Sequence, residues 1–104
     1  MYASHTYMAF GYLFFEKQDF VQAARAFYTA VATREAIVDE NSPLLAQALN
    51  NLACCLLYLN KRAHALNYLR ISECVLEMSL EQHDEYVLTV KRNIQCALNQ
   101  PVYV

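Results

Sequence analysis

The sequence contains few of the residues that interrupt helices. Its 104 residues include one glycine and two prolines, which leaves little material for the tight turns and linkers of a β-rich fold. Charged residues make up 17% of the chain and hydrophobic residues 57%. This composition predicts a single globular domain over residues 1–104 that is built from helices.

A long apolar run is also missing. The longest, Tyr7–Phe15, has nine residues and ends at Glu16, whereas a membrane span needs about 18 to 20. The start of the sequence has neither the basic region nor the small-residue cleavage site of a signal peptide. A net charge of −2 argues against a nucleic-acid footprint. We therefore expect no membrane insertion, no nucleic-acid partner and a cytoplasmic location.

The motifs of common enzymes are absent as well. The sequence has no glycine-rich phosphate loop, no His-Glu-x-x-His and no Gly-x-Ser-x-Gly. His83 and Asp84 adjoin each other, but in a segment predicted to be a loop, where charged residues usually cap helices or face water. The sequence predicts that the protein is not an enzyme and needs no cofactor.

The four cysteines, Cys54, Cys55, Cys74 and Cys96, could indicate a metal site or buried thiols. No Cys-x-x-Cys is present, and adjacent side chains such as Cys54 and Cys55 point about 100° apart on a helix. We favour reduced thiols in the core over a metal site.

Breaks in the apolar pattern predict five helices, at about 7–16, 20–38, 43–59, 61–80 and 85–99. The polar turn 17–19 ends in Asp19, which can cap the second helix. Ser42 followed by Pro43 is typical of a helix start, and Asn60 tolerates the left-handed conformation of a tight turn. Such short loops predict antiparallel neighbours. Residues 1–5 are expected to be a short lead-in.

An internal repeat of 42 residues connects these helices. The same shift pairs residues of similar character along the chain: Gly11 with Ala53, Ala23 with Ala65, Phe27 with Leu69, Asn51 with Asn93, Leu52 with Ile94 and Cys54 with Cys96. A repeated helical hairpin is the sequence signature of a solenoid.

The small and large residues of this repeat resemble the tetratricopeptide repeat. Gly11, Ala23, Phe27 and Ala30 fit its pattern in the first repeat, and Ala53, Ala65, Leu69 and Ser72 fit it in the second. The usual repeat has about 34 residues; the 42-residue period and the segment 49–53 are similar to the variety found in kinesin light chains. The resemblance implies an all-α, right-handed stack of about five antiparallel helices, with repeats at about 6–40 and 43–82 and a capping helix at 85–99.

The resemblance also implies an adaptor or scaffold that binds a peptide or helix of a partner protein, with the cytoskeleton as one place of attachment. In this family the first helix of each hairpin lines a concave groove. We assign the groove to the side of the helix opposite the packing stripe. In the first helix the packing stripe is expected to be Tyr7, Phe10, Gly11 and Phe14. The predicted groove residues are Met8, Tyr12, Phe15, Gln47, Asn50, Asn51, Cys54, Tyr58, Arg92, Asn93 and Asn99, with His5 and Cys96 beside them.

Amide side chains in such a groove can pair with the backbone of an extended peptide, because each offers a donor and an acceptor. For each asparagine alone, a solvated helix face is the alternative. Co-chaperone repeats grip a carboxylate with Lys and Asn on the first helix, but here Met8 and Tyr12 stand at those positions, which argues against that specialised activity.

The alternative function is a structural subunit of a larger assembly or a homo-oligomer, attached through its amino-terminal end. The remaining side of the first helix, Tyr2, Thr6, Ala9 and Leu13, carries no charge, and an exposed apolar patch of this kind predicts a covering partner. A lid formed by residues 1–6 is the competing possibility. At the other end, Val87, Val90, Ile94, Ala97 and Leu98 are expected to face inward and close the stack.

Overall fold

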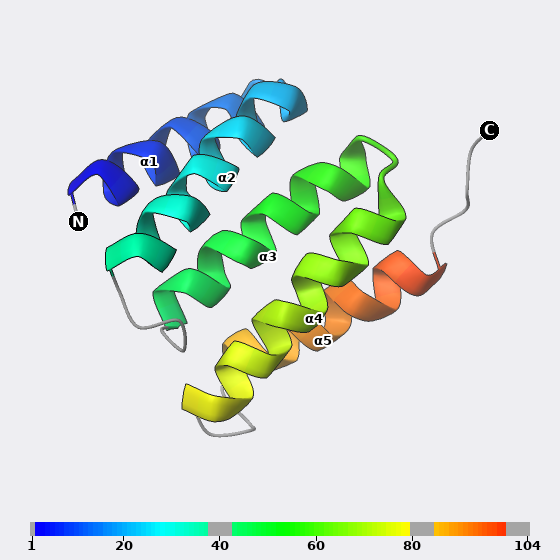
Figure 1. Ribbon diagram of the computed structural model, residues 1–104. Helices are drawn as coiled ribbons and strands as arrows, with labels where there is room; N and C mark the ends of the chain where they lie inside the picture. Colours follow the sequence, from blue (N-terminus) through cyan, green and yellow to red (C-terminus); the bar gives the residue numbers. More distant parts are fainter. Residues whose placement is uncertain (1, 38–42, 80–84, 100–104) are drawn as a thin grey trace.

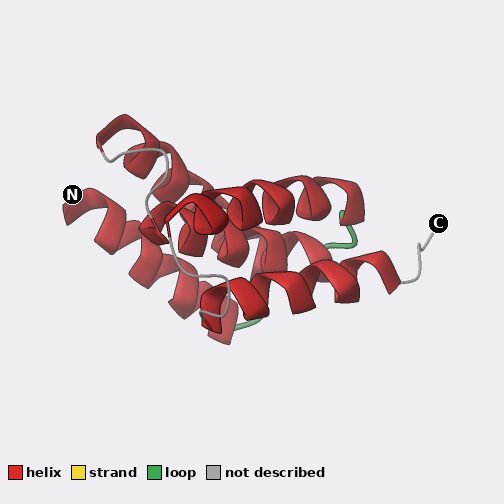
Figure 2. Ribbon diagram, turned by 90° about the horizontal axis from the view of Figure 1, so that it is seen from below, coloured by secondary structure: helices red, strands yellow, loops and turns green. Residues whose placement is uncertain are grey.

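The computed structural model describes residues 2–37, 43–79 and 85–99, with side chains over 6–33, 43–78 and 85–99. The described chain forms five helices and no strand (Figures 1 and 2). These are α1 (Tyr2–Glu16), α2 (Phe20–Ile37), α3 (Pro43–Tyr58), α4 (Arg62–Ser79) and α5 (Glu85–Asn99). The predicted all-α architecture is confirmed. One boundary is corrected, because α1 begins at Tyr2 and residues 2–6 therefore extend the helix instead of forming a lead-in or a lid.

The two hairpin turns that the structure describes have the same backbone. Gln18 and Asn60, 42 residues apart, both adopt positive φ, at 62° and 61°. In the first turn the amides of Gln18 and Asp19 donate to the carbonyls of Phe15 and Phe14, each at 2.9 Å. This pair of bonds around a left-handed residue is a Schellman motif, which satisfies the last carbonyls of a helix.

The second turn repeats the motif bond for bond. The amides of Asn60 and Lys61 donate to the carbonyls of Leu57 and Leu56, at 3.0 and 2.8 Å. The 42-residue repeat therefore holds in the backbone as well as in the sequence. The predicted cap is present too, since Asp19 Oδ1 accepts from the amide of Gln22 at 3.2 Å.

Small residues let the two helices of each hairpin approach closely. Gly11 is buried, and a Cβ placed on it would lie 2.5 Å from the ring of Phe27, which is 1% exposed. In the second hairpin Ala53, Ala65 and Leu69 are fully buried. The expected close approach is therefore observed in both hairpins.

The helices stack in chain order, with α3 shared by two apolar clusters (Figure 1). Cluster 1 joins α1, α2 and α3 through Met8, Ala23, Phe27, Ala30, Val31, Leu45, Ala48, Leu49, Leu52 and Cys55. Cluster 2 joins α3, α4 and α5 through Ala46, Ala53, Ala65, Leu69, Val75, Leu76, Val87, Val90, Ile94 and Ala97. Leu56 and Tyr68 pack against both clusters. Each helix thus buries its apolar face against its neighbours in the stack, as in a helical repeat.

The prediction of which side of α1 is buried is wrong for three residues. Met8, expected in the groove, is 6% exposed and belongs to cluster 1, whereas Tyr7 and Phe10, expected to pack, are 37% and 47% exposed. Gly11 and the half-buried Phe14 do face the core. Because no charged or amide residue occurs between Tyr7 and Phe15, the apolar period could not select one side of this helix.

Three other residues lie on a different side from the one expected. Leu98, expected to face inward, is 45% exposed because no further helix of the described chain covers the last turn of α5. Cys74 and Cys96, expected in the core, are also exposed. All four thiols are free, and Cys55 is the buried one.

Candidate functional site

A polar cluster connects the first helices of the two hairpins. The hydroxyl oxygen of Tyr12 on α1 accepts a hydrogen bond from Gln47 Nε2 at 3.2 Å and another from Asn51 Nδ2 at 2.9 Å, both on α3. The ring of Tyr12 is held edge-on against Phe27, with the centroids 5.5 Å apart. Tyr12 therefore combines a buried ring contact with a hydroxyl that stays at the surface.

A second polar cluster connects α3 to α5. Asn93 Nδ2 donates to Asn50 Oδ1 at 2.9 Å and approaches Cys54 Sγ at 3.7 Å. Asn50 is buried at 9% exposure, whereas Asn51 and Asn93 are half-buried. We call the surface formed by Tyr12, Gln47, Asn51 and Asn93 the amide face. It runs over the three first-position helices α1, α3 and α5.

The hydrogen bonds leave part of the amide face available. A tyrosine hydroxyl and a primary amide can each donate and accept. Within the described residues, no acceptor receives the Tyr12 hydroxyl proton, and no donor reaches Gln47 Oε1, Asn51 Oδ1 or Asn93 Oδ1. The face can therefore offer one fixed donor and three fixed acceptors to another molecule.

An aromatic stack involves the same two helices, since Phe15 follows Tyr12 by three residues on α1 and Tyr58 follows Asn51 by seven on α3. Phe15 lies edge-on to Phe20 at 5.3 Å and to Tyr58 at 5.5 Å, and Phe20 stacks on Tyr58 with the centroids 4.4 Å apart. Tyr58 is 64% exposed, so the stack fixes a large ring that a ligand could still reach. The role of Phe20 was not predicted, because its partners lie on two other helices.

The structure brings together part of the predicted groove and separates the rest. Tyr12, Gln47 and Asn51 are joined by hydrogen bonds, and Phe15 and Tyr58 by a ring contact. Cys54 is half-buried beside Asn93, and Arg92, Cys96 and Asn99 are exposed on α5. Met8 and Asn50 are corrected, since both are buried. The His5 and Tyr2 side chains lie outside the described residues. Of the predicted attachment face, Thr6, Ala9 and Leu13 are exposed.

The thiols of Cys54 and Cys55, near this surface, have raised pKa values and so are held in the protonated form. Burial raises the pKa of Cys54, and the proximity of Cys96 raises it further. Burial, with a smaller contribution from Cys54, raises the pKa of Cys55 to about 12. A thiol is a metal ligand or nucleophile as the thiolate, so neither cysteine is prepared for that role at neutral pH. No group of three or more His, Cys, Asp or Glu residues within the described ranges could hold a metal ion.

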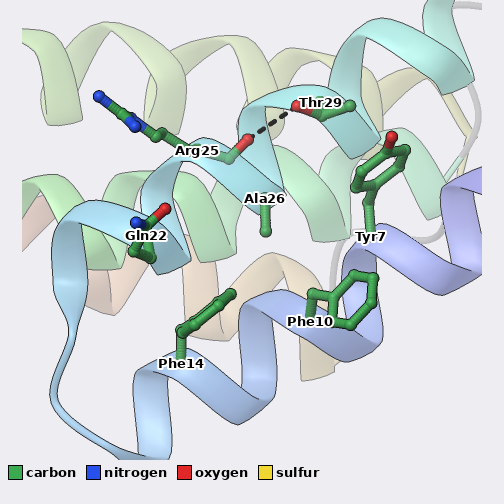
Figure 3. A pocket seen from close by; sticks show the side chains of 7 residues that line it. All are labelled: Tyr7, Phe10, Phe14, Gln22, Arg25, Ala26 and Thr29. Atoms are coloured by element: carbon green, nitrogen blue, oxygen red, sulfur yellow. Dashed lines mark hydrogen bonds between the residues drawn. The ribbon is translucent and has the colours of Figure 1, made fainter.

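A shallow groove, which sequence reasoning missed, lies between α1 and α2 on the side of the first hairpin away from α3 (Figure 3). It has a volume of about 320 Å³ and is lined by Tyr7, Phe10 and Phe14 of α1 and by Gln22, Arg25, Ala26 and Thr29 of α2. We call it the outer groove. The sequence signal that could have revealed it is the repeat itself, since none of the described helices lies beside α1 on the side where α2 lies beside α3. None of the described helices is both long and apolar enough to cross a membrane.

Comparison with known proteins identifies the repeat. A family model described as "Tetratricopeptide repeat" matches residues 2–72 of the chain. No curated protein and no solved structure matches the sequence. The matched residues cover both hairpins through most of α4 and contain Tyr12, Gln47 and Asn51.

Proposed function

Because the chain belongs to the tetratricopeptide repeat family, we propose that it is an adaptor or scaffold module that binds a peptide or helix of a partner protein on the amide face. The family is a non-catalytic interaction fold, and a catalytic role has no support in the site. The partner would pair its backbone with the amides and place an apolar side chain against Phe15 and Tyr58.

The hydrogen bonds of Tyr12 to Gln47 and Asn51 carry this proposal. They fix three side chains from two helices in one geometry before a ligand arrives, so less rotamer entropy is lost on binding. The acceptors that remain match the amides of an extended or helix-terminal backbone. Solubility alone would not require a hydrogen bond between side chains that are 39 residues apart in the sequence, as Tyr12 and Asn51 are.

Peptides selected from a phage-displayed random library against the whole chain would test the proposal. Asn51→Ala and Asn93→Ala should each weaken binding by about two- to tenfold, the value of one or two hydrogen bonds, and the double change by roughly tenfold or more. Asn67→Ala removes an exposed amide from α4 and is the matched control. Selected peptides that bind the unchanged chain and all four variants equally well would contradict a role for the amide face.

The second candidate function is attachment through the amino-terminal end, as a subunit of a larger assembly. Two large apolar side chains favour it, since Phe10 and Leu13 are 47% and 46% exposed. The expected cytoplasmic location with attachment to the cytoskeleton belongs to the proposal as well, and it rests on the similarity to the kinesin-light-chain variety of the repeat.

A further inference from the structure

The hydrogen bonds of the amide face determine which way its amides point. Gln47 Nε2 and Asn51 Nδ2 both donate to the Tyr12 hydroxyl oxygen, at 3.2 and 2.9 Å, and both bonds are exposed. The oxygen of each amide is therefore left for another molecule. The two amides cannot both turn their oxygens toward Tyr12, because the hydroxyl has a single proton to donate.

The third amide of the face is held in the same way. Asn93 Nδ2 donates to Asn50 Oδ1 at 2.9 Å, which leaves Asn93 Oδ1 without a donor among the described residues. Asn50 is 9% exposed, so its own amide adds no donor to the surface. The amide face thus presents three acceptors and one donor, the Tyr12 hydroxyl, and it is complementary to a molecule that is rich in donors.

The charge on the α1 and α3 part of the face is negative. α3 contains no charged residue, and among the side chains described on α1 the charged one is Glu16. Glu16 follows Tyr12 by four residues, so it lies one turn away on the same side of the helix, whereas Lys17 lies beyond the end of α1. Arg92 adjoins Asn93 on α5 but points about 100° away from it. The α1 and α3 part of the face is therefore suited to a cation.

We propose that this part of the amide face selects a guanidinium group, and that the partner contributes an arginine side chain that donates to Gln47 Oε1 and Asn51 Oδ1. The inference rests on the proposed function and identifies the side chain that the site recognises. The Tyr12 hydroxyl proton remains for a backbone carbonyl of the same partner. Tyr58 follows Asn51 by about two helical turns on α3, so the apolar contact remains for another residue of the partner.

The chemistry of the face separates arginine from the other candidates. A carboxylate offers only acceptors, and it would meet three acceptors, one donor and the charge of Glu16. A peptide N–H supplies one donor, and a lysine ammonium is a strongly hydrated point charge, whereas a guanidinium has five donors in a planar fork that can reach two acceptors at once. Its plane also stacks on aromatic rings, and Tyr12 is 44% exposed beside these acceptors.

Nα-acetyl-arginine methylamide, titrated into the ¹⁵N-labelled whole chain, is the probe. The side-chain amide signals of Gln47 and Asn51 should shift saturably in the NMR spectrum. The corresponding lysine and glutamine derivatives should bind at least about threefold more weakly, since they lose a charge-assisted bond or the second donor. The glutamate derivative should not shift these signals.

Two variants test the direction of the amides. Asn51→Asp keeps the acceptor and adds a negative charge, so it should tighten binding of the arginine probe by about three- to tenfold, a gain that misfolding cannot produce. Asn67→Asp makes the same change at an exposed amide of α4 and should leave the affinity unchanged. Tyr12→Phe keeps the ring against Phe27 but releases both amides, so it should lower the ratio of the arginine affinity to the glutamine affinity.

The outcomes distinguish this inference from the proposed function. Absence of saturable shifts, equal affinities for the arginine and glutamine derivatives, or weaker arginine binding by Asn51→Asp would overturn the inference. Random-library peptides that depend on Asn51 and Asn93 but contain no arginine would overturn it as well and leave the proposed function standing. Library peptides that bind independently of both asparagines would contradict the proposed function, and the inference with it.

Discussion

At the scale of single residues, Gly11 lies where one methyl group would collide with a buried ring. In an open helix, Gly→Ala stabilises by about 0.5–1 kcal/mol. Here the added Cβ would lie 2.5 Å from Phe27, and overpacking of this kind costs about 1–3 kcal/mol. We expect Gly11→Ala to lower the free energy of unfolding, as measured by urea denaturation.

The second repeat provides the compensating change. Ala53 and Leu69 occupy the positions of Gly11 and Phe27 there, and both are fully buried. The double change Gly11→Ala with Phe27→Leu copies that pair, so it should lose less stability than the sum of the two single changes. A sum that is simply additive would mean that the Gly11–Phe27 contact does not limit the approach of α1 and α2.

Cys55 makes stability depend on pH in the alkaline range. Its pKa in the folded chain is about 12, against an ordinary value near 9, so the folded state holds its proton more tightly than the unfolded state. The contribution is fully present below about pH 9 and is lost as the pH rises toward 12, by at most about 1.4 kcal/mol per unit. Cys55→Ala should flatten this part of the stability profile. Cys74→Ala removes an exposed thiol and should not alter the slope; equal slopes in all three proteins would contradict the assignment.

At the scale of the elements, both described turns place a residue with a side chain in a left-handed conformation. Such a conformation costs an L-residue roughly 1–2 kcal/mol, and Asn tolerates it better than Gln. Gln18→Gly should therefore raise the free energy of unfolding by about 0.5–1 kcal/mol, and Asn60→Gly by less. Lys17→Gly, next to Gln18 but without positive φ, is the control and should lose stability. The prediction fails if Gln18→Gly is as harmful as Lys17→Gly.

The helices themselves were predictable from the sequence, because their ends depend on local chemistry. Asp19 at the first turn and Asn60 at the second mark helix ends through capping and a left-handed conformation, which act over three or four residues. The facing of α1 was not predictable in the same way. Its apolar residues surround the helix, so only the packing of α2 and α3 decides that Met8 is buried and Phe10 is not.

The residue types of the candidate site could be predicted from the sequence, but the hydrogen-bonded pairs that these residues form could not. Asn51 and Tyr12 are both in the predicted groove, yet the bond between them depends on the angle between two hairpins, which no local pattern encodes. Asn50 and Asn51 are neighbours on α3 and point about 100° apart. Asn50 is therefore buried and accepts from the half-buried Asn93, whereas Asn51 reaches the surface, although the sequence predicts both in the groove.

At the scale of the whole molecule, the two clusters divide the stack into two regions, and each region is stabilised mainly by its own cluster. Cluster 1 contains side chains of α1, α2 and α3, and cluster 2 contains side chains of α3, α4 and α5. In a stack of this kind each hairpin interacts with its neighbours alone, so the ends can open separately. Leu56 and Tyr68 are the side chains that pack against both clusters, and they should couple the two halves.

Hydrogen exchange on three variants tests this coupling. Leu49→Ala and Ile94→Ala each remove a core side chain, 3% and 6% exposed, at a cost of about 2–5 kcal/mol. Leu49→Ala should speed exchange most in α1 and α2, and Ile94→Ala most in α5, while Tyr68→Ala should act on both halves. Uniform acceleration over all helices in every variant would show a single cooperative unit.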